Sequence, residues 1–288
     1  MLFLSFAAFL VAQDPQAGRS PLQDELRRII ASSGADVAVA YRTLDGKTEL
    51  LLDGDTPFHA ASTMKVPVMI ELFRQAGSGT LSLDEPLPVR NQFKSIVDGS
   101  PYTLSEGDDS DSEVYAAVGK TMTLRKLCEL MITVSSNFAA NLLIERLGVD
   151  NIRRTVTSLG ADGMQVLRGV EDQKAFDKGL NNTTTARGLM VLLDTLAHGR
   201  AVGLDADKEM IGILERQKFN DAIPAGVPSG TVIAHKTGNI TRIHHDAAVV
   251  FATRPYVLVL LVRGIDDQKK SAALMGELSR AVYEANAR

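Results

Sequence analysis

The sequence predicts an α/β protein of the α+β type, with an antiparallel five-stranded sheet, terminal helices that flank it, and a large all-helical lobe inserted between its strands. Three observations predict this class. Two strand-like segments precede residue 59, three follow residue 205, and helical periodicity dominates the stretch between them. Because neither group of strands forms a stable sheet alone, both ends of the chain are expected to join in one sheet.

The first predicted helix begins with a capping box. Ser20-Pro21-Leu22-Gln23 places a serine cap before a proline at the first helical position, and Gly34 ends the helix. The apolar positions that repeat at helical spacing within it are Leu22, Leu26, Ile29 and Ile30.

A hairpin is predicted to supply the first two strands. Val37, Val39 and Tyr41 occupy alternate positions, as in a strand. Residues 49–52 form the returning strand, and Asp45-Gly46 lies between the two strands as a common hairpin turn.

The rest of the chain follows the same order of signals. Helical periodicity occurs in residues 66–73, 123–147, 151–159 and 184–196. Strands are predicted at residues 231–234, 247–251 and 256–262, before an amphipathic helix that carries Leu274, Leu278 and Val282 on one stripe. The sequence therefore predicts a discontinuous α/β lobe (residues 20–58 and 206–288), a helical lobe (residues 59–205), and a site where they meet.

The composition limits the classes of function. The 288 residues include 45% hydrophobic and 23% charged residues, as in ordinary soluble globular proteins, which excludes disorder of the whole chain. The formal net charge is −4 with no basic stripe, so no nucleic-acid partner is expected. The single cysteine, Cys128, cannot form an internal disulfide, and no zinc-binding spacing of Cys and His occurs.

Residues 1–12 are predicted to be a signal peptide. The eleven residues 2–12 are continuously apolar and a polar stretch follows them. A membrane-spanning helix takes about 20 residues, whereas this length fits the apolar region of a secretory signal. We therefore expect export to the periplasm or the medium and no stable membrane insertion. The alternatives for this segment are a buried first strand or a wrongly assigned start codon.

Three short patterns carry residues suited to nucleophilic chemistry: Ser62-Thr63-Met64-Lys65, Ser135-Ser136-Asn137, and Lys236-Thr237-Gly238 at the end of a late strand. A serine hydroxyl is a weak nucleophile until an adjacent base removes its proton. One helical turn separates Ser62 from Lys65, so both side chains lie on one face. A partly desolvated lysine among other cations becomes neutral enough to act as the base. Each pattern alone is weak, since Ser62 alone would be interpreted as a helix-start serine.

The three ordered patterns and their flanks resemble the penicillin-recognising serine hydrolases and are most similar to class A β-lactamases. The resemblance covers roughly residues 20–288 and includes the runs 58–65 (Phe-His-Ala-Ala-Ser-Thr-Met-Lys) and 135–143 (Ser-Ser-Asn-Phe-Ala-Ala-Asn-Leu-Leu). It implies the fold of these enzymes and a serine hydrolase that opens the β-lactam ring through an acyl-enzyme. It also implies that no metal and no organic cofactor is needed.

The resemblance implies catalytic roles for three motif residues. Ser62 would attack the lactam carbonyl while Lys65 helps to take its proton. Ser135 would relay a proton to the leaving nitrogen.

Substrate contacts are implied for five further residues, namely Asn137, Lys236, Thr237, Gly238 and Asn239. Asn137 would hold the side-chain amide of the substrate, and Lys236 with Thr237 would bind its carboxylate. The backbone N–H of Asn239 would complete an oxyanion hole with that of Ser62. Glycine at 238 would let the strand approach the substrate closely.

The largest departure from the family pattern concerns deacylation. Class A enzymes place a glutamate two residues after an arginine and an asparagine four residues later, whereas residues 168–175 here are Arg-Gly-Val-Glu-Asp-Gln-Lys-Ala. Glu171 therefore lies one residue late, and Ala175 stands in place of the asparagine. Glu171 is the predicted general base for deacylation. The alternative is a surface acid beside Lys174.

Two smaller departures affect the walls of the cleft. Ser136 replaces the aspartate of the family's Ser-Asp-Asn pattern, so a buried carboxylate is lost. Where many relatives have an arginine the chain has a His-His-Asp triplet, which leaves Arg242 as the nearest guanidinium and His244 as a partial substitute. The acidic segment 106–113 is predicted to be a solvated loop, because it lacks the residues that a calcium loop needs.

Three functions follow as hypotheses. The first is an exported, monomeric β-lactamase that acts on small-molecule β-lactams. The second is a slowly deacylating, penicillin-binding D-alanyl peptidase or esterase. The third is a non-catalytic module that binds peptidoglycan or a partner. The retained nucleophile–base pair argues against it, because binding alone does not require such a pair.

Overall fold

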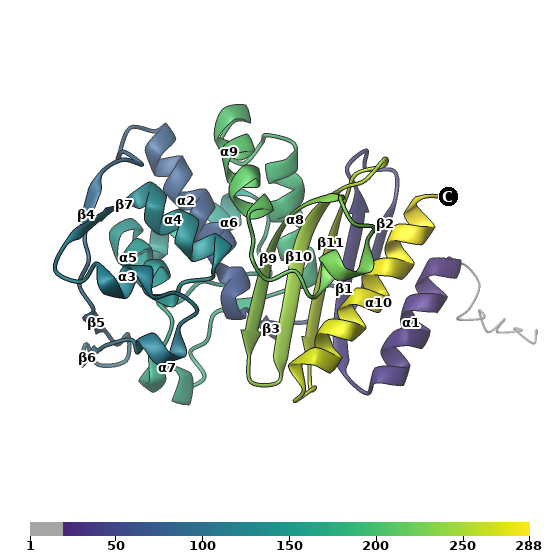
Figure 1. Cartoon of the computed structure of the whole chain (residues 1–288), viewed down its shortest axis with the longest axis horizontal. Helices are drawn as coiled ribbons and strands as arrows, with labels where there is room; N and C mark the ends of the chain where they lie inside the picture. Colours follow the sequence, from purple (N-terminus) through teal and green to yellow (C-terminus); the bar gives the residue numbers. More distant parts are fainter. Residues whose placement is uncertain (1–19) are drawn as a thin grey trace, which may run out of the picture.

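The computed structural model describes residues 20–288, so the predicted signal peptide lies outside the described residues. Its centre is a five-stranded antiparallel sheet with the strand order β2-β1-β11-β10-β9 (Figure 1). These strands are β1 (Asp36–Thr43), β2 (Glu49–Leu52), β9 (Val232–Ile240), β10 (Ile243–Phe251) and β11 (Tyr256–Arg263). The predicted joining of both chain ends in one antiparallel sheet is therefore confirmed.

The terminal helices, α1 (Pro21–Ser33) and α10 (Gln268–Asn286), pack side by side against one face of the sheet (Figure 1). The predicted start of α1 is confirmed, since Ser20 Oγ accepts a hydrogen bond from the Gln23 N–H (3.2 Å). Gly34 ends the helix in the left-handed conformation (φ 68°), which glycine adopts without steric cost.

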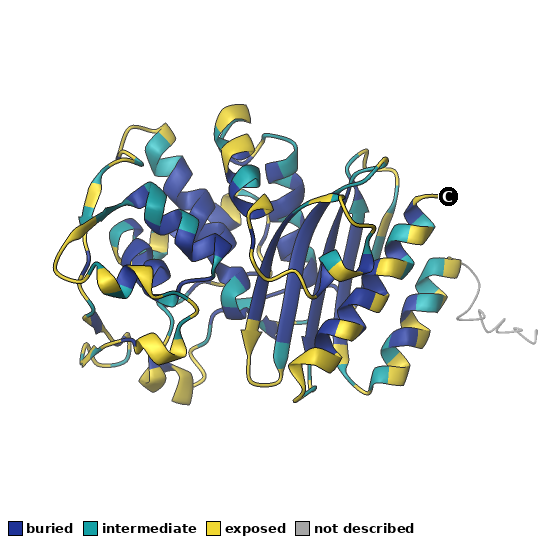
Figure 2. Ribbon diagram, viewed as in Figure 1, coloured by how far each residue is buried: buried dark blue, intermediate teal, exposed yellow. Residues whose placement is uncertain are grey.

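The opposite face of the sheet packs against the inserted helices. In β1 the predicted alternation divides the strand between two cores. Val37, Val39 and Tyr41 join the core under the terminal helices, whereas Ala38 and Ala40 join the core of the inserted helices. All five residues are buried, so the sheet is a central layer between two helical layers (Figure 2).

The inserted stretch is mainly helical. Its long helices are α2 (Lys65–Gly77), α4 (Leu124–Thr133), α5 (Asn137–Leu147), α6 (Val149–Ser158) and α8 (Ala186–Ala197), and α9 (Leu204–Glu215) follows them. The short helices are η1 (Ala61–Met64), η2 (Glu106–Asp108), α3 (Glu113–Ala116) and α7 (Gln173–Asp177), with η3 (Ile223–Gly226) in the C-terminal part.

Three two-stranded ladders also lie in this stretch, so it is not entirely helical. They pair β3 (Phe58–His59) with β8 (Thr183–Thr184), β4 (Pro86–Pro88) with β7 (Thr121–Thr123), and β5 (Phe93–Lys94) with β6 (Pro101–Tyr102). The division of the chain into lobes at residues 58 and 205 stays a prediction.

Two elements differ from the sequence prediction in ways that shape the cleft. The helix predicted over residues 123–147 is broken into α4 and α5, because Ser135 has a left-handed φ of 61° and Ser136 caps α5. The strand predicted to end at Lys236-Thr237-Gly238 continues to Ile240, since all three motif residues pair with β10. The motif therefore lies inside β9, which packs against η1.

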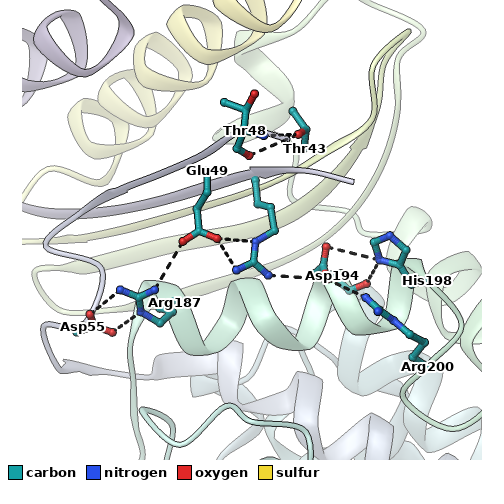
Figure 3. Close-up of polar contacts among 9 residues, drawn as sticks. Thr43, Thr48, Glu49, Asp55, Arg187, Asp194, His198 and Arg200 are labelled. Atoms are coloured by element: carbon teal, nitrogen blue, oxygen red, sulfur yellow. Dashed lines mark hydrogen bonds and ion pairs between the residues drawn. The ribbon is translucent and has the colours of Figure 1, made fainter. Parts of the chain in front are cut away.

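Charged side chains join α8 to the hairpin edge of the sheet (Figure 3). Arg42 of β1 pairs with Glu49 of β2, which also contacts Arg187 of α8 (3.7 Å). Arg42 also lies 3.9 Å from Asp194 of α8. Partly exposed pairs of this kind contribute little stability, so the packing of α8 on the sheet depends mainly on its buried apolar face.

Candidate active site

Ser62 lies in η1, a single 3₁₀ turn that leads directly into α2. Because Lys65 is the first residue of α2, one turn brings its side chain beside Ser62, and Lys65 Nζ lies 3.0 Å from Ser62 Oγ. Lys65 is fully buried. The structure thus brings together a hydroxyl and an amine at hydrogen-bonding distance, as a serine nucleophile with its base requires.

The break between α4 and α5 supplies the partners of Lys65. Its Nζ donates hydrogen bonds to the carbonyl oxygen of Ser135 (2.6 Å) and to Asn137 Oδ1 (2.7 Å). Burial lowers the pKa of Lys65 to about 7, against the opposing charges of Asp109 and Glu171. A large share of the Lys65 amines is therefore neutral near neutral pH and available to accept a proton.

Lys236 reaches the same place from β9. Its Nζ donates hydrogen bonds to Ser135 Oγ (3.0 Å) and to the Thr237 carbonyl oxygen (2.8 Å). Since Lys65 Nζ lies 3.3 Å from Ser135 Oγ, this hydroxyl stands between two amines and can pass protons between them. Burial, and next the charge of Lys65, lower the pKa of Lys236.

Gly238 allows β9 to lie against η1. A Cβ added at this position would be 3.1 Å from the Ser62 backbone nitrogen and 3.2 Å from Thr63 Cγ2, closer than side chains normally pack. Ala61 meets the same strand in a left-handed conformation (φ 45°). Asn239, the next residue of β9, lines the cleft beside Ser62, and the oxyanion hole from their N–H groups stays a prediction.

Two cavities meet at Ser62. We name the first, of about 360 Å³, the Glu171 chamber, and the second, of about 500 Å³, the Ser135 chamber. The residues that line both are Ser62, Asp108, Asn137 and Asn239. A larger groove, of about 840 Å³, lies between α1, β2 and α10, away from every predicted site residue.

The two chambers differ in chemistry. The Glu171 chamber exposes the apolar side chains of Phe176 and Ile240 beside His59. The residues that line the Ser135 chamber are of polar types apart from Phe219, and they include Thr237 and Lys218. The cleft can therefore hold an apolar group on one side of Ser62 and a polar or anionic group on the other.

Glu171 lies in the first of these chambers in a strained conformation. Its φ is 60°, which is uncommon for a residue with a side chain, and its Oε1 accepts a hydrogen bond from Asn137 Nδ2 (3.2 Å). Partial burial, and next the charge of Asp108, raise the pKa of Glu171. Glu171 is nevertheless exposed where it lines the chamber, and Lys174 bonds to Asp98 (2.7 Å) and not to Glu171. The role of Glu171 as general base stays a prediction.

Side-chain hydrogen bonds hold the backbone on both sides of Glu171. Asn141 of α5 accepts from the Val170 N–H (2.7 Å) and donates to the Val170 carbonyl (3.0 Å). Asp172 caps α7 and accepts from Ser95 Oγ (2.8 Å). The loop is therefore rebuilt around Glu171 and fixes the unusual backbone conformation at this residue. Ala175, in the place of the family's asparagine, is fully buried.

Of the His-His-Asp triplet in β10 and Arg242 in the turn before it, only His244 reaches the cleft. His244 lines the Ser135 chamber, 4% exposed, and its Nδ1 has no hydrogen-bond partner among the described residues. Arg242 lines neither chamber and pairs with Asp266 (3.2 Å). His244 of β10, and not Arg242 of the preceding turn, can therefore contact a ligand in the cleft.

Asp109 is the site residue that the sequence analysis missed. It belongs to the acidic segment predicted to be a solvated loop, yet its carboxylate accepts hydrogen bonds from the backbone N–H groups of Asn137 (2.9 Å) and Phe138 (2.9 Å). A run of acids in the sequence gives no sign of which one turns inward. The Ser136 in place of the family's aspartate was the available signal, because it left α5 without a carboxylate at its start.

Comparison with known proteins decides the family. Residues 21–286 match the sequence model of the beta-lactamase enzyme family. The chain belongs to this family. The beta-lactamase Toho-1 of Escherichia coli is 25% identical over 259 residues, which are 88% of this chain and 84% of that protein. The beta-lactamase AST-1 of Nocardia asteroides is 28% identical over 262 residues, 88% of this chain and 80% of that protein.

Two solved structures illustrate that the fold is shared. The ancestral class A beta-lactamase GNCA is 25% identical and superposes with a TM-score of 0.80 over 92% of this chain and 99% of its own. PBP-A is 26% identical, with a TM-score of 0.78 over 92% of this chain and 95% of its own. The predicted resemblance to class A β-lactamases and the predicted fold are both confirmed.

Proposed function

We propose that the protein is a serine β-lactamase that hydrolyses the β-lactam ring through an acyl-enzyme on Ser62. Lys65 takes the hydroxyl proton of Ser62, the Ser62 oxygen forms a bond to the lactam carbonyl carbon, and the carbon–nitrogen bond breaks. Ser135 gives its proton to the leaving nitrogen and receives one from Lys65. These transfers balance without any further reactant.

The observation that carries this proposal is the buried Lys65 amine, with a pKa of about 7, at 3.0 Å from Ser62 Oγ. A general base works best when its pKa lies near the operating pH. The Lys236 amine, 3.0 Å from Ser135 Oγ, joins the same network of proton transfers.

Deacylation is assigned to Glu171. The carboxylate would take a proton from a water molecule while the water oxygen attacks the ester carbonyl, and the proton then passes to Ser62 Oγ as the ester bond breaks. Three features support this role: the shared chamber with Ser62, the contact with Asn137, and the raised pKa of the carboxyl.

The time course of acylation and release with benzylpenicillin tests the proposal. Intact-protein mass spectrometry should show one transient adduct while the drug is consumed in many turnovers. Ser62→Ala should abolish both signals, and Ser229→Ala, on an exposed loop, should leave both unchanged. Undiminished drug consumption by Ser62→Ala would refute the assignment of the nucleophile.

A slowly deacylating penicillin-binding hydrolase is the second candidate. The rebuilt loop favours it, because Glu171 is displaced in sequence and Ala175 cannot hold a water molecule. The chain is also similar to PBP-A, and the structure of a PBP-A variant is described as an acyl-enzyme complex with penicillin G. An adduct that persists for hours after a single addition of drug would favour this candidate over the first.

The proposed enzyme is exported and monomeric. The apolar residues 2–12 support export, and no helix within residues 20–288 is long and apolar enough to cross a membrane. N-terminal sequencing of the protein from the periplasm or medium tests export, and light scattering tests whether the protein is a monomer.

The third hypothesis is a non-catalytic module that binds peptidoglycan. It would be favoured if Ser62 failed to react with every penicillin tested.

A further inference from the structure

The first turn of α5 lies at the centre of the candidate site. Asn137 is its first residue, and the Asn137 side chain contacts both Lys65 (2.7 Å) and Glu171 (3.2 Å). A shift of this turn would therefore misplace the contacts of both proposed bases at once. The first N–H groups of a helix have no partner within the helix, so the turn needs acceptors from elsewhere.

Ser136 satisfies only part of this need. Its side chain accepts a hydrogen bond from the Ala139 N–H (3.2 Å), which leaves the N–H groups of Asn137 and Phe138. Both of these are bound by Asp109, whose oxygens lie 2.9 and 3.0 Å from the Asn137 nitrogen and 2.9 Å from that of Phe138. The carboxylate thus occupies the positive end of the helix dipole, where a negative charge is favoured.

Asp109 is itself held in place. The hydroxyl of Tyr115 in α3 donates hydrogen bonds to Asp109 Oδ2 (3.3 Å) and to the Ser105 carbonyl (3.1 Å). α3 packs against α5, so the acidic segment folds back onto the helix that it caps (Figure 1). The segment is therefore a structural part of the site and not a freely solvated loop.

We propose that Asp109 is a positioning residue for acylation: it fixes the backbone of Asn137, whose side chain contacts both Lys65 and Glu171. In the resembled family an aspartate lies between the serine and the asparagine of the motif. Here that position is Ser136, and the carboxylate comes from a different segment of the chain. The role in acylation rests on the proposed function. The effect of the Asp109 charge on the pKa of Lys65 does not rest on it.

The sign of the charge effect follows from the groups that face Lys65. Asp109 and Glu171 are negative and favour the charged form of the Lys65 amine, whereas burial disfavours it. The neighbouring Lys236 amine, whose own pKa is lowered, bonds to the Ser135 hydroxyl that also contacts Lys65. Removal of the Asp109 charge therefore lowers the pKa of Lys65 further. The acid limb of the acylation rate should move to lower pH while the plateau rate falls, because Asn137 is no longer fixed.

The test compares Asp109→Asn with the matched control Asp111→Asn. Asp111 lies in the same segment and caps α3 through the Glu113 and Val114 N–H groups, without touching α5. We expect Asp109→Asn to lower the plateau acylation rate about tenfold and to move the Lys65 titration, followed by carbon-13 NMR, to lower pH. Asp111→Asn should leave both measurements unchanged, and Asp109→Glu should restore the Lys65 titration because it keeps the charge.

A merely structural role would give a different pattern. If Asp109→Asn lowers the melting temperature but leaves the Lys65 titration and the plateau rate at their wild-type values, the proposal is overturned. If Asp109→Asn does not fold, the same measurements are made on Asp109→Ser, which keeps an uncharged hydrogen-bond acceptor on a short side chain. Absence of acylation in the wild type would refute the proposed function. The NMR titration would still show whether the Asp109 charge changes the pKa of Lys65.

Discussion

Two lysine side chains are buried on either side of one hydroxyl in this protein. Lys65 and Lys236 are fully buried, and their amines lie 3.3 and 3.0 Å from Ser135 Oγ. Two positive charges in a medium of low polarity disfavour each other and disfavour burial, so protons leave these amines more readily than from exposed lysines. The same arrangement explains how an amine can act as a base near neutral pH.

The pH dependence of acylation follows from this pair. The acylation rate of Ser62 should rise with pH through about 7, the pKa of Lys65, because only the neutral amine accepts the proton. Stopped-flow kinetics with a chromogenic cephalosporin measure the acylation rate at a series of pH values, from about two pH units below 7 to about two above it. A rate that falls with rising pH across this interval would exclude Lys65 as the base.

Individual motif residues were predictable from the sequence, since their chemistry depends on short spacings. Ser62 and Lys65 are one turn apart in any helical conformation, so their contact needed no knowledge of the fold. Asp109 was not predictable, because its role depends on a loop that folds back onto a helix 28 residues further along the chain. Pro67 is the third residue of α2, a position where an N–H has no partner within the helix, so the proline removes no hydrogen bond of this helix.

At the scale of elements, the site depends on the contact between β9 and η1. The contact brings the strand that carries Lys236 against the turn that carries Ser62, and it requires glycine at position 238. The sequence predicted both elements but misjudged their extent. Helical periodicity continues across residues 123–147, and only the backbone conformation of Ser135 and the cap at Ser136 reveal the break between α4 and α5.

Gly238→Ala tests the contact between β9 and η1. The added methyl group would lie 3.1 Å from the Ser62 nitrogen, so the strand must move away from the nucleophile. We expect the acylation rate to fall about tenfold, since small misplacements at a reacting centre are costly.

Gly212→Ala in α9 is the matched control. A Cβ there meets nothing closer than 3.8 Å, so the variant should keep full activity and gain about 0.5–1 kcal/mol in unfolding free energy. Equal activity of both alanine variants would contradict the account of the contact.

At the scale of the whole molecule, the cleft is asymmetric about Ser62. If Ser135 protonates the leaving nitrogen and Glu171 activates water at the acyl carbonyl, the acyl part of the substrate faces the Glu171 chamber. Phe176 and Ile240 make that chamber partly apolar. The negative charge of the ionised Glu171 carboxylate disfavours anionic groups there. The chamber therefore suits an apolar, uncharged acyl side chain.

Phe176→Ala tests this orientation. The ratio of kcat/KM for benzylpenicillin to that for 6-aminopenicillanic acid, which lacks the benzyl side chain, should fall about tenfold. Phe219→Ala, in the Ser135 chamber, should change both values alike and leave the ratio unchanged, since the leaving group is the same. A ratio that responds to Phe219 and not to Phe176 would reverse the orientation.

The stability of the fold in acid depends on a buried histidine of strand β10. His245 Nδ1 accepts a hydrogen bond from the Val262 N–H (3.2 Å) and cannot take a proton there, and burial lowers the pKa of His245 to about 4. Between pH 6.5 and about 4 the unfolded chain therefore binds more protons than the folded one. Unfolding free energy should decrease as pH falls through this window, by up to about 3 kcal/mol.

Urea unfolding at a series of pH values measures this effect. His245→Leu removes the titrating group, so its unfolding free energy should depend less steeply on pH than that of the wild type, even if the variant is less stable overall. Identical slopes in both proteins would show that His245 does not contribute to acid lability.

The central claim is that Ser62 and Lys65 act as a nucleophile–base pair in a cleft closed by β9. Peptide mapping of Glu171→Gln after brief exposure to benzylpenicillin tests it most directly, since loss of the deacylation base should trap the adduct. The account predicts one penicilloyl group per chain, on the peptide that contains Ser62, and none when Lys65→Ala is added. An adduct on any other residue, or an undiminished adduct without the lysine, would contradict it.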